Sequence, residues 1–396
     1  MRMQALGDVA TLQAGVGFPP DLQGRPDGAY PLAKVGDISR GGRSGHPILA
    51  TADHYVDEVD LLRLRAKPIP RGSVLFAKIG EAIARNHRVI AGRDMLIDNN
   101  AMAAIPGPRI ESRYLFYFLR TVDFYQLASA TTVPALRKSE LARILVPVPP
   151  LAAQQRIVRV LDAAEALRAQ RRAALSQVED LAGAIFLDMF GDPAANPRSW
   201  PQVQLLTLMI DGPQNGLYKP ASEYGSGTPI LRIDAFYDGK VTKLASLKRV
   251  RLSPDEIATY ALRTGDLVVN RVNSMEYLGK SAVIPETSET VVFESNMMRF
   301  GLDPRKADPQ YVVQFLQSGF VKSQILTGAK HAVNQSSINQ KDVQSFRINV
   351  PPLPLQKNFA RRIAAVEKLK ASHRASLAEM DALFASLQHR AFRGEL

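Results

Sequence analysis

The chain has 396 residues, 46% of them hydrophobic, and no cysteine. This length predicts two or three domains with ample core, and the lack of cysteine excludes disulfides and thiolate metal sites. The formal net charge of +12 is typical of a protein that binds a polyanion, although a basic protein without such a partner is the alternative.

No stretch of the sequence approaches the roughly 18 consecutive apolar residues that a membrane-spanning helix needs, and residues 1–15 lack the continuous apolar segment of a signal peptide. We therefore expect no membrane association. A soluble, cytoplasmic protein is the prediction.

Residues 1–148 predict a mixed α/β domain. Runs of β-branched and aromatic residues between glycine and proline indicate strands, and apolar residues at helical spacing indicate helices. The expected elements are strand-like alternation in residues 3–15, strands at residues 30–38, 70–79, 88–91 and 100–105, an amphipathic aromatic helix at residues 112–127, and a short helix at residues 139–144 capped by Ser139.

Residues 149–192 predict one long helix. There is no glycine or proline between Leu151 and Ala182, and alanine, leucine, arginine and glutamine dominate, which are residues that lose little rotamer freedom in a helix. Gly191 and Pro193 supply stop signals. A helix of about 40 residues is roughly 60 Å long, so we expect it to have a packing partner.

The partner is a second copy of the same stretch. Residues 351–396 align without a gap onto the first copy at a separation of 202 positions, with PPLPLQ repeating PPLAAQ. Residues 193–350 repeat the order of elements in residues 1–148, while the loops differ. The predicted organisation is a domain at residues 1–148, a spacer helix at 149–192, a second domain at 193–350 and a second spacer helix at 351–396.

Apolar positions in both long helices recur at heptad spacing, which predicts an antiparallel coiled-coil pair. Packing of each helix on its own globular domain is the alternative. Both seams turn basic at equivalent central positions, Arg168 and Arg171 in one helix and Lys370 and His373 in the other. The apolar seam residues are Ile157, Leu161, Leu175, Val178, Ile185, Phe359, Ile363, Leu377, Met380 and Leu387.

Motifs for chemistry are missing from the sequence. Gly279, Lys280 and Ser281 resemble the end of a phosphate-binding loop, but the earlier glycine of that motif is absent. The six histidines lack metal-ligand spacing, and the acidic residues between Asp53 and Asp60 fit a solvated loop better than a nuclease site. We expect no catalytic residue, no metal and no cofactor on this chain.

Polar and basic loop residues fit contacts to DNA. Arginine reads guanine, asparagine and glutamine read adenine, and lysine neutralises phosphate; each residue taken alone also fits an ordinary solvated surface. Aligned pairs such as Lys78 and Arg271 are the strongest candidates. The predicted DNA-binding residues are Lys34, Arg40, Arg43, Lys78, Arg85, Asn86, Arg88, Arg137 and Lys138 in the first domain, and Lys219, Arg232, Asn270, Arg271, Asn273, Lys280, Lys330, Asn334, Gln335 and Ser336 in the second.

The chain resembles the specificity subunits of type I restriction–modification systems over its whole length. The motifs that carry the resemblance are PPLAAQQRIV with the tail FLDMFGDP, and PPLPLQKNFARRI with the tail AFRGEL. Gln154-Gln155 becomes Gln356-Lys357 in the second copy, which leaves open whether both helices dock partners in the same way.

The resemblance implies two target-recognition domains that read an asymmetric bipartite site in double-stranded DNA, while the paired helices set the gap between the half-sites. It also implies docking of two DNA adenine methyltransferase subunits, which use S-adenosylmethionine, and of a restriction/translocase subunit, which uses ATP and Mg²⁺. This chain would then be non-catalytic. A stand-alone two-domain coiled-coil DNA-binding or structural protein is the alternative.

Overall fold

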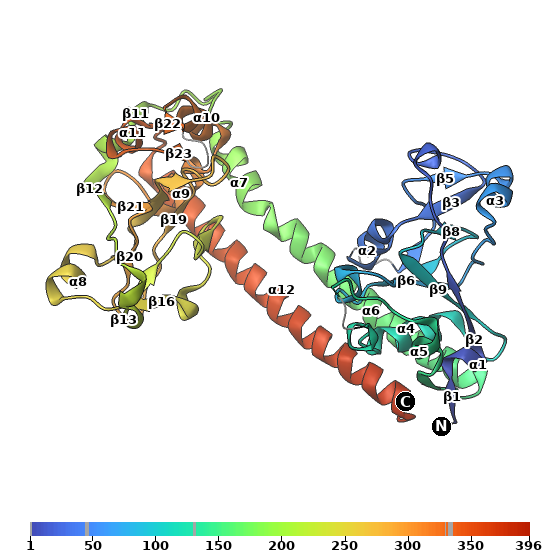
Figure 1. Ribbon diagram of the computed structural model, residues 1–396. Helices are drawn as coiled ribbons and strands as arrows, with labels where there is room; N and C mark the ends of the chain where they lie inside the picture. Colours follow the sequence, from blue (N-terminus) through green and yellow to red (C-terminus); the bar gives the residue numbers. More distant parts are fainter. Residues whose placement is uncertain (1, 44–46, 130–131, 329, 332–335) are drawn as a thin grey trace. The chain divides into compact units, whose positions relative to one another are not determined.

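The computed structural model describes residues 2–43, 47–129, 132–328, 330–331 and 336–396, and the ribbon is drawn in Figure 1. The chain divides into two compact units: unit 1 is Met1–Ala174 with His373–Leu396, and unit 2 is Leu175–Ser372. Each unit therefore combines one globular domain with parts of both long helices. The domain boundaries at residues 148, 192 and 350 stay predictions.

The sheets of unit 1 are formed by strands far apart in the sequence. Its strands are β1 (Met3–Ala5), β2 (Ala10–Ala14), β3 (Tyr30–Ala33), β4 (Ile48–Leu49), β5 (Tyr55–Val56), β6 (Val74–Ala77), β7 (Arg88–Ala91), β8 (Leu96–Ile97), β9 (Ala101–Pro106) and β10 (Leu145–Pro147). They form a five-stranded sheet in the order β2-β9-β6-β7-β4, a three-stranded sheet in the order β5-β3-β8, and the pair β1-β10.

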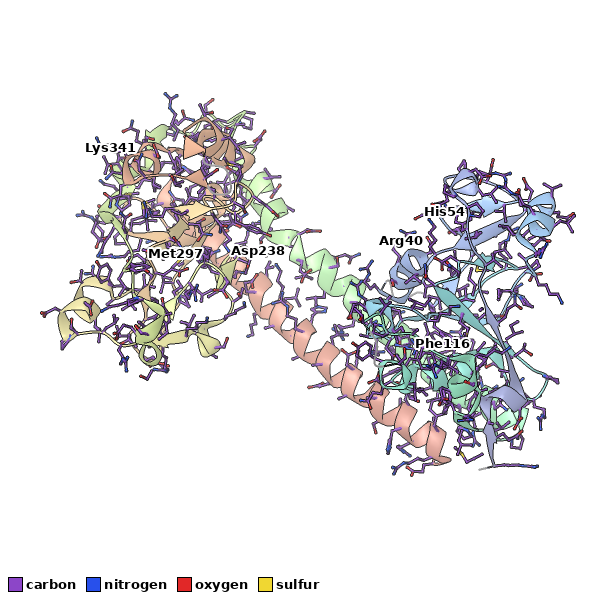
Figure 2. The ribbon with its side chains drawn as sticks, viewed as in Figure 1. Arg40, His54, Phe116, Asp238, Met297 and Lys341 are labelled. Carbon is purple, nitrogen blue, oxygen red and sulfur yellow. The ribbon has the colours of Figure 1, made fainter. Side chains whose placement is uncertain are left out.

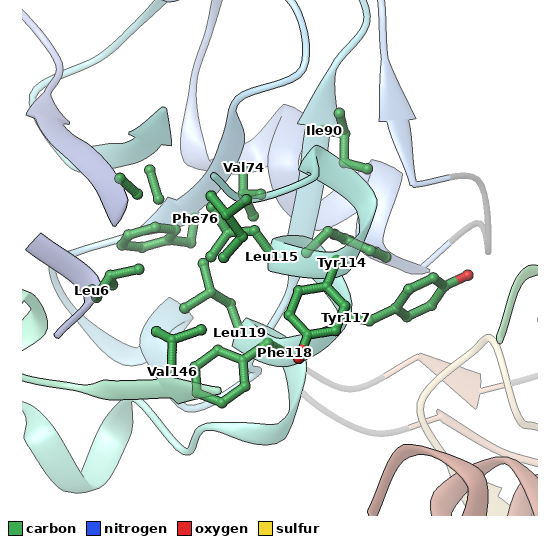
Figure 3. Close-up of a cluster of buried hydrophobic side chains, with 14 of the residues drawn as sticks. Leu6, Val74, Phe76, Ile90, Tyr114, Leu115, Tyr117, Phe118, Leu119 and Val146 are labelled. Carbon is green, nitrogen blue, oxygen red and sulfur yellow. The ribbon is translucent and has the colours of Figure 1, made fainter. Parts of the chain in front are cut away.

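The helices of unit 1 cover a core of apolar and aromatic side chains. They are α1 (Leu6–Val9), α2 (Val35–Arg43), α3 (Glu58–Leu64), α4 (Ser112–Thr121) and α5 (Lys138–Ala142), besides the long helices. Leu115 and Tyr114 of α4 are fully buried together with Val74 and Phe76 of β6, and Figure 3 shows this cluster. The hydroxyl of Tyr114 donates to Pro147 O at 2.8 Å, so this buried polar group is satisfied.

Unit 2 repeats this plan. Its strands are β11 (Gln202–Gln204), β12 (Met209–Asn215), β13 (Tyr224–Leu231), β14 (Phe236–Tyr237), β15 (Gly239–Val241), β16 (Lys248–Val250), β17 (Leu267–Asn270), β18 (Val272–Asn273), β19 (Ser281–Val283), β20 (Val292–Phe293), β21 (Met297–Leu302), β22 (Lys330–His331), β23 (Ser336–Ser337) and β24 (Arg347–Asn349). Its shorter helices are α8 (Pro254–Tyr260), α9 (Pro309–Leu316), α10 (Gly319–Gly328) and α11 (Gln340–Ser345).

The sheet orders make the repeat explicit. The order β12-β21-β17-β19-β15-β14 in unit 2 extends the unit 1 order by one strand, β16-β13-β20 corresponds to β5-β3-β8, and β11-β24 corresponds to β1-β10. Unit 2 adds the small sheet β18-β23-β22. The predicted mixed α/β fold with an internal repeat is confirmed.

The long helices differ in continuity. The second is α12 (Leu353–Arg393), an unbroken run of 41 residues. The expected single helix at residues 149–192 is instead α6 (Leu151–Glu179) followed by α7 (Leu181–Phe190), with Asp180 between them. Asp180 keeps right-handed helical backbone angles, so the break is slight. Aspartate competes for backbone hydrogen bonds inside helices, which accounts for its position.

The long helices run antiparallel within each unit. In unit 1, Arg156 Nη2 donates to Leu396 O at 2.9 Å, and Arg168 Nε donates to Asp381 Oδ1 at 2.7 Å. Positions thus rise along α6 as they fall along α12. In unit 2, Lys370 Nζ donates to Glu179 O at 3.0 Å, and the ring centroids of Phe186 and Phe359 lie 5.6 Å apart, so positions again rise along one helix as they fall along the other.

Near its C-terminal end, each long helix carries a phenylalanine that packs on a tyrosine of the other repeat. Phe392, near the end of α12, makes an edge contact with Tyr114 of α4 in unit 1, with ring centroids 5.3 Å apart. Its counterpart Phe190, at the end of α7, makes the equivalent contact with Tyr311 of α9 in unit 2 at 4.8 Å. The FRGEL and FGDP tails therefore carry a packing residue that closes each core.

The predicted seam residues are all at least half-buried. Ile157 and Leu161 belong to the core of unit 1 together with the domain, and Phe359 and Ile363 belong to the core of unit 2. At these positions the helices pack on their domains as well as on each other. Val178 is also buried, and the half-buried seam residues are Leu175, Ile185, Leu377, Met380 and Leu387.

The basic centre of the helix pair is compensated by acidic and polar partners. Arg168 pairs with Glu165 at 2.6 Å and with Asp381 at 2.5 Å. Arg171 Nη1 lies 3.2 Å from Nδ1 of its own counterpart, His373. These contacts supply polar pairing where apolar seam residues are missing.

The glutamine of the PPLxxQ motif joins each long helix to its domain. Gln154 is fully buried, accepts from Glu111 N at 2.8 Å, and donates to Arg109 O at 2.9 Å and Pro149 O at 2.8 Å. Gln356, also fully buried, makes the equivalent contacts. In unit 2 the partners are Asp308 N at 2.9 Å, Lys306 O at 3.5 Å and Pro351 O at 2.8 Å.

Several local predictions are wrong. The expected strand at residues 30–38 ends at Ala33, and α2 begins at Val35, because the Asp37 carboxylate accepts from Lys34 N at 2.7 Å at the start of this helix. The aromatic helix ends at Thr121 rather than residue 127. Ser139 is not a cap, since α5 already begins at Lys138.

Candidate nucleic-acid interface

Lys78 and Arg271 occupy the same backbone position in the two units. The N–H groups of Lys78 and Arg271 donate to Asn100 O and Asn296 O, each at 2.9 Å, and their carbonyls accept from Leu136 N at 2.8 Å and Ile338 N at 3.0 Å. This position is therefore fixed by the scaffold from both sides. The side chains of Lys78 and Arg271 are half-exposed.

Other predicted residues lie beside this repeated position. Arg137 and Lys138 are exposed and follow Leu136 directly, with Lys138 opening α5. In unit 2, Ser336 of β23 is buried and pairs with Asn273 of β18, which is half-buried. Lys330 lies in β22. Asn334 and Gln335 lie outside the described residues.

Four predicted residues of unit 1 gather around one cavity. It has a volume of about 430 Å³ and is lined by Arg43 at the end of α2, by Arg85, Asn86 and Arg88, and by parts of α4 and α6. Its formation depends on Gly42, because a Cβ there would lie 2.7 Å from the Cβ of His87. Phe116, which also lines the cavity, lies on α4 (Figure 2).

Arg88 is buried without a carboxylate partner among the described residues. Its side chain is 4% exposed and donates to His87 O at 3.0 Å and to Asn86 Oδ1 at 2.5 Å, while its guanidinium lies 3.8 Å from the Phe124 ring centroid. Burial, followed by the positive charge of Arg120, lowers the pKa of Arg88 to about 9. Arg88 Nε has no hydrogen-bond partner among the described residues.

The cavity also lowers the pKa of His87 below its ordinary value. Burial is the main cause, followed by the positive charges of Arg43, Arg85 and Arg88. His87 Nδ1 has no partner among the residues that the structure describes. This part of unit 1 is therefore strongly positive and polar.

In unit 2, two of the predicted DNA-binding residues line a cavity. Lys219 and Arg232 line a cavity of about 490 Å³ together with Tyr218, whose side chain is 79% exposed. Lys219 pairs with Glu256 at 2.7 Å and Arg232 with Glu294 at 3.1 Å. The cationic groups here are partly neutralised, unlike those of unit 1.

The remaining predicted residues already have internal partners. Lys34 Nζ donates to Gln23 at 2.8 Å. Arg40, on α2 (Figure 2), pairs with Asp37 and with Asp53, the latter at 2.7 Å. Two more residues are engaged within unit 2: Asn270 is fully buried, and Lys280 donates to Ile233 O at 2.6 Å beneath the ring of Tyr237.

His87, Arg120 and Arg172 line the unit 1 cavity but are not among the residues that the sequence predicts for the site. Arg120 belongs to the aromatic helix and Arg172 to the long helix, and the sequence predicts both helices from their packing pattern alone. A cationic residue at the polar edge of an otherwise aromatic helix was the available signal for Arg120. Only the fold brings these two helices to the end of α2.

Among the residues that the structure describes, no group of three or more His, Cys, Asp or Glu side chains is arranged to hold a metal ion. None of the described helices combines the length and apolar character that a membrane span requires.

A duplicated α/β unit with basic surface groups, joined by paired helices, defines a class of two-domain recognition protein. The family model for the type I restriction modification DNA specificity domain matches residues 1–177 and again residues 215–381. The chain belongs to this family.

Curated relatives agree with this assignment. The chain is 25% identical over 288 residues to the type I restriction enzyme EcoKI specificity subunit of Escherichia coli, covering 68% of this chain and 61% of that protein. It is 24% identical over 312 residues to the StySPI specificity subunit of Salmonella potsdam, covering 74% of this chain and 67% of that one. The chain is also 31% identical over 175 residues to a Methanocaldococcus jannaschii protein described as the type I restriction enzyme MjaX specificity subunit, covering 44% of this chain and 40% of that protein.

Solved structures share the fold. One chain from a study of complex assembly and conformational transition of the type I R-M system matches 100% of this chain and 98% of its own length at 19% identity, with a TM-score of 0.63. The S subunit of a type I system from M. genitalium matches 99% of this chain and 96% of its own length at 10% identity, with a TM-score of 0.56.

Proposed function

We propose that this chain is the DNA sequence-recognition subunit of a type I restriction–modification complex and reads an asymmetric bipartite target. The observation that carries the proposal is a repeated scaffold with unlike surfaces. Gln154 and Gln356 make the same contacts in the two units. The exposed, cationic Arg85 of unit 1, by contrast, is replaced at the equivalent position of unit 2 by the apolar Leu278. Two such units suit two different half-sites.

In this proposal the chain is non-catalytic and acts through its partners. Two DNA adenine methyltransferase subunits dock on the helix pair and use S-adenosylmethionine, and a restriction/translocase subunit joins them with ATP and Mg²⁺. Double-stranded DNA is the ligand, and the location is cytoplasmic. The net charge of +12 supports the DNA partner.

Lys78 and Arg271 are the proposed base- or phosphate-contacting groups at the repeated position, one for each half-site. Backbone hydrogen bonds on both sides fix the backbone at these two residues, and a fixed backbone is what direct readout by a side chain requires. The family match favours this function over a stand-alone two-domain DNA-binding protein, which would have no effect on DNA modification.

The test is methylome sequencing of cells that express a type I methyltransferase encoded beside this chain, with the chain present, absent, or carrying Lys78→Ala. An asymmetric bipartite adenine motif that appears only with the chain supports the proposal. An unchanged methylome would contradict it and favour the stand-alone candidate. Methylation or cleavage by the purified chain alone would contradict the non-catalytic role.

A further inference from the structure

The cavity of unit 1 is enclosed by five arginines and one carboxylate. Arg43, Arg85 and Arg88 have no ion-pair partner within the described part of the chain, and Arg120 and Arg172 share Glu165 at 3.5 Å and 3.3 Å. Glu165 is also paired with Arg168. Asp381 also pairs with Arg168 at 2.5 Å and with Arg172 at 3.6 Å, but it is not part of the lining, whose five arginines outnumber its one carboxylate.

This excess is costly for the folded protein in the absence of a ligand. Like charges close together repel, and a buried guanidinium without a carboxylate loses hydration that its hydrogen bonds only partly replace. Arg88 shows both effects, since it is 4% exposed and its Nε has no described partner. Such costs are characteristic of binding sites rather than of scaffold.

Unit 2 has a cavity at the equivalent place with a different lining. Pairing of Phe76 with Arg88 in unit 1 corresponds to pairing of Val269 with Ser281 in unit 2. The unit 2 cavity, of about 400 Å³, adjoins this second pair through Gly279 and Lys280. Both cavities therefore lie at the same strand pair of the repeated sheet.

The unit 2 lining has no excess of positive charge, because its two lysines are matched by Asp238 and Glu276. Arg85 corresponds to Leu278 and Arg120 to Gln317, both of which line the unit 2 cavity. The cavity's two lysines, Lys280 and Lys322, donate to backbone carbonyls, with closest contacts of 2.6 Å each. The scaffold thus provides the cavity twice, and only the lining of the first copy holds more cationic than carboxylate side chains.

We propose that the arginine-lined cavity of unit 1 binds a phosphate group. Arginine is suited to this ligand because its planar guanidinium forms paired charge-assisted hydrogen bonds with phosphate oxygens. The exposed Arg43 and Arg85 would meet the ligand first, and Arg88 would contact it at the base of the cavity. The cavity volume of about 430 Å³ falls within the range of small-ligand sites.

The phosphate has two possible sources: the backbone of duplex DNA or a free phosphate compound. The duplex source rests on the proposed function, and the free source does not. The pKa of His87 can be used to detect a bound anion, because His87 lies in the cavity lining beside three arginines. A bound anion should raise the pKa of His87 toward or above 6.5.

The experiment is an NMR pH titration of ring-labelled histidines in the full chain, with the His87 signal assigned from a His87→Gln variant. The chain is measured alone, with inorganic phosphate, with pyrophosphate, and with duplex DNA. The variants Arg43→Ala and Arg85→Ala remove exposed cavity cations. Arg71→Ala is the matched control, because Arg71 is exposed and lies outside the cavity lining.

With at least one probe, the pKa of His87 should rise by about one unit, and this rise should be lost in Arg85→Ala but kept in Arg71→Ala. A response to phosphate or pyrophosphate identifies the free source. A response to duplex alone identifies the backbone source, and Arg85→Ala should then reduce the slope of log K against log salt by about one. No response to any probe, or one that Arg43→Ala and Arg85→Ala leave intact, would overturn the proposal.

The proposed function is tested separately by the methylome. Motif-specific methylation together with a silent His87 would remove the phosphate site and leave the recognition function standing. A rise in the pKa of His87 with phosphate, in a chain that directs no methylation, would support the phosphate site and contradict the recognition function.

Discussion

The substitution Gln154→Ala tests whether the motif glutamine holds the long helix to its domain. It removes three hydrogen bonds, to Glu111 N, Arg109 O and Pro149 O. Each hydrogen bond contributes a net ~0.5–1.5 kcal/mol, and a buried group left unpaired costs ~1–3 kcal/mol. The N–H of Glu111 and the carbonyls at this buried junction lose their partner together, so we expect local opening to become easier by about 2–4 kcal/mol.

The assay is hydrogen exchange, followed by mass spectrometry, over residues 109–115 and 149–161. A change of about 2–4 kcal/mol corresponds to exchange roughly 30- to 1000-fold faster, since each 1.4 kcal/mol is about tenfold. The neighbouring Gln155 is exposed and has no side-chain hydrogen bond among the described contacts, so Gln155→Ala is the control. Gln356→Ala should produce the same acceleration over residues 306–312 and 351–363. Less than about fivefold acceleration in Gln154→Ala, or equal acceleration in Gln155→Ala, would refute the anchoring role.

Four further predictions concern other parts of the chain. Lys78→Ala and Arg271→Ala should each weaken binding to one half-site by ~1–3 kcal/mol if the side chain reads a base, measured by fluorescence anisotropy at several salt concentrations; an equal loss on all sequences would indicate a phosphate contact instead. Phe392→Ala removes the half-buried ring that packs on Tyr114 and should cost about 2–3 kcal/mol of the stability of unit 1, somewhat below the full-burial value; Phe392→Leu should restore most of it in urea unfolding. Inserting one helical turn into both α6 and α12 should lengthen the gap in the methylated motif, and an unchanged gap would reject the spacer role. Because burial lowers the pKa of His87 from 6.5, the unfolded chain binds that proton more readily, so unit 1 should lose stability as pH falls through 6.5, and His87→Gln should weaken this dependence.

The repeat was predictable because it is encoded in aligned residues. The strand at residues 88–91 and the long helices follow from local composition, and both are present. The start of α2 was missed because it depends on one carboxylate, Asp37, bonding back to Lys34 N. Sheet order was out of reach, since β4 pairs with β7 only after the chain has folded across more than forty residues.

The grouping of the candidate site residues is less accessible from the sequence. Residue type identified Arg43, Arg85 and Arg88 as cationic groups, but nothing local indicated that they share a cavity with Arg172 of the long helix. Burial of Asn270 is equally non-local, because it depends on its place at the end of a central strand. The charge and polarity of each residue can be read from the sequence, but which residues lie together in one cavity is determined by the fold.

The closing phenylalanines have a consequence for the ancestry of the chain. The core of unit 1 includes Phe384 and packs Phe392 from the far end of the sequence, so residues 1–192 alone would leave Tyr114 uncovered. Those residues carry Phe190, however, which makes the equivalent contact in unit 2. Two separate copies of a half-length chain could exchange their helices and complete each other's cores as a domain-swapped dimer. Gene duplication and fusion of such a dimer would give the present single chain, and fusion would free the two halves to diverge.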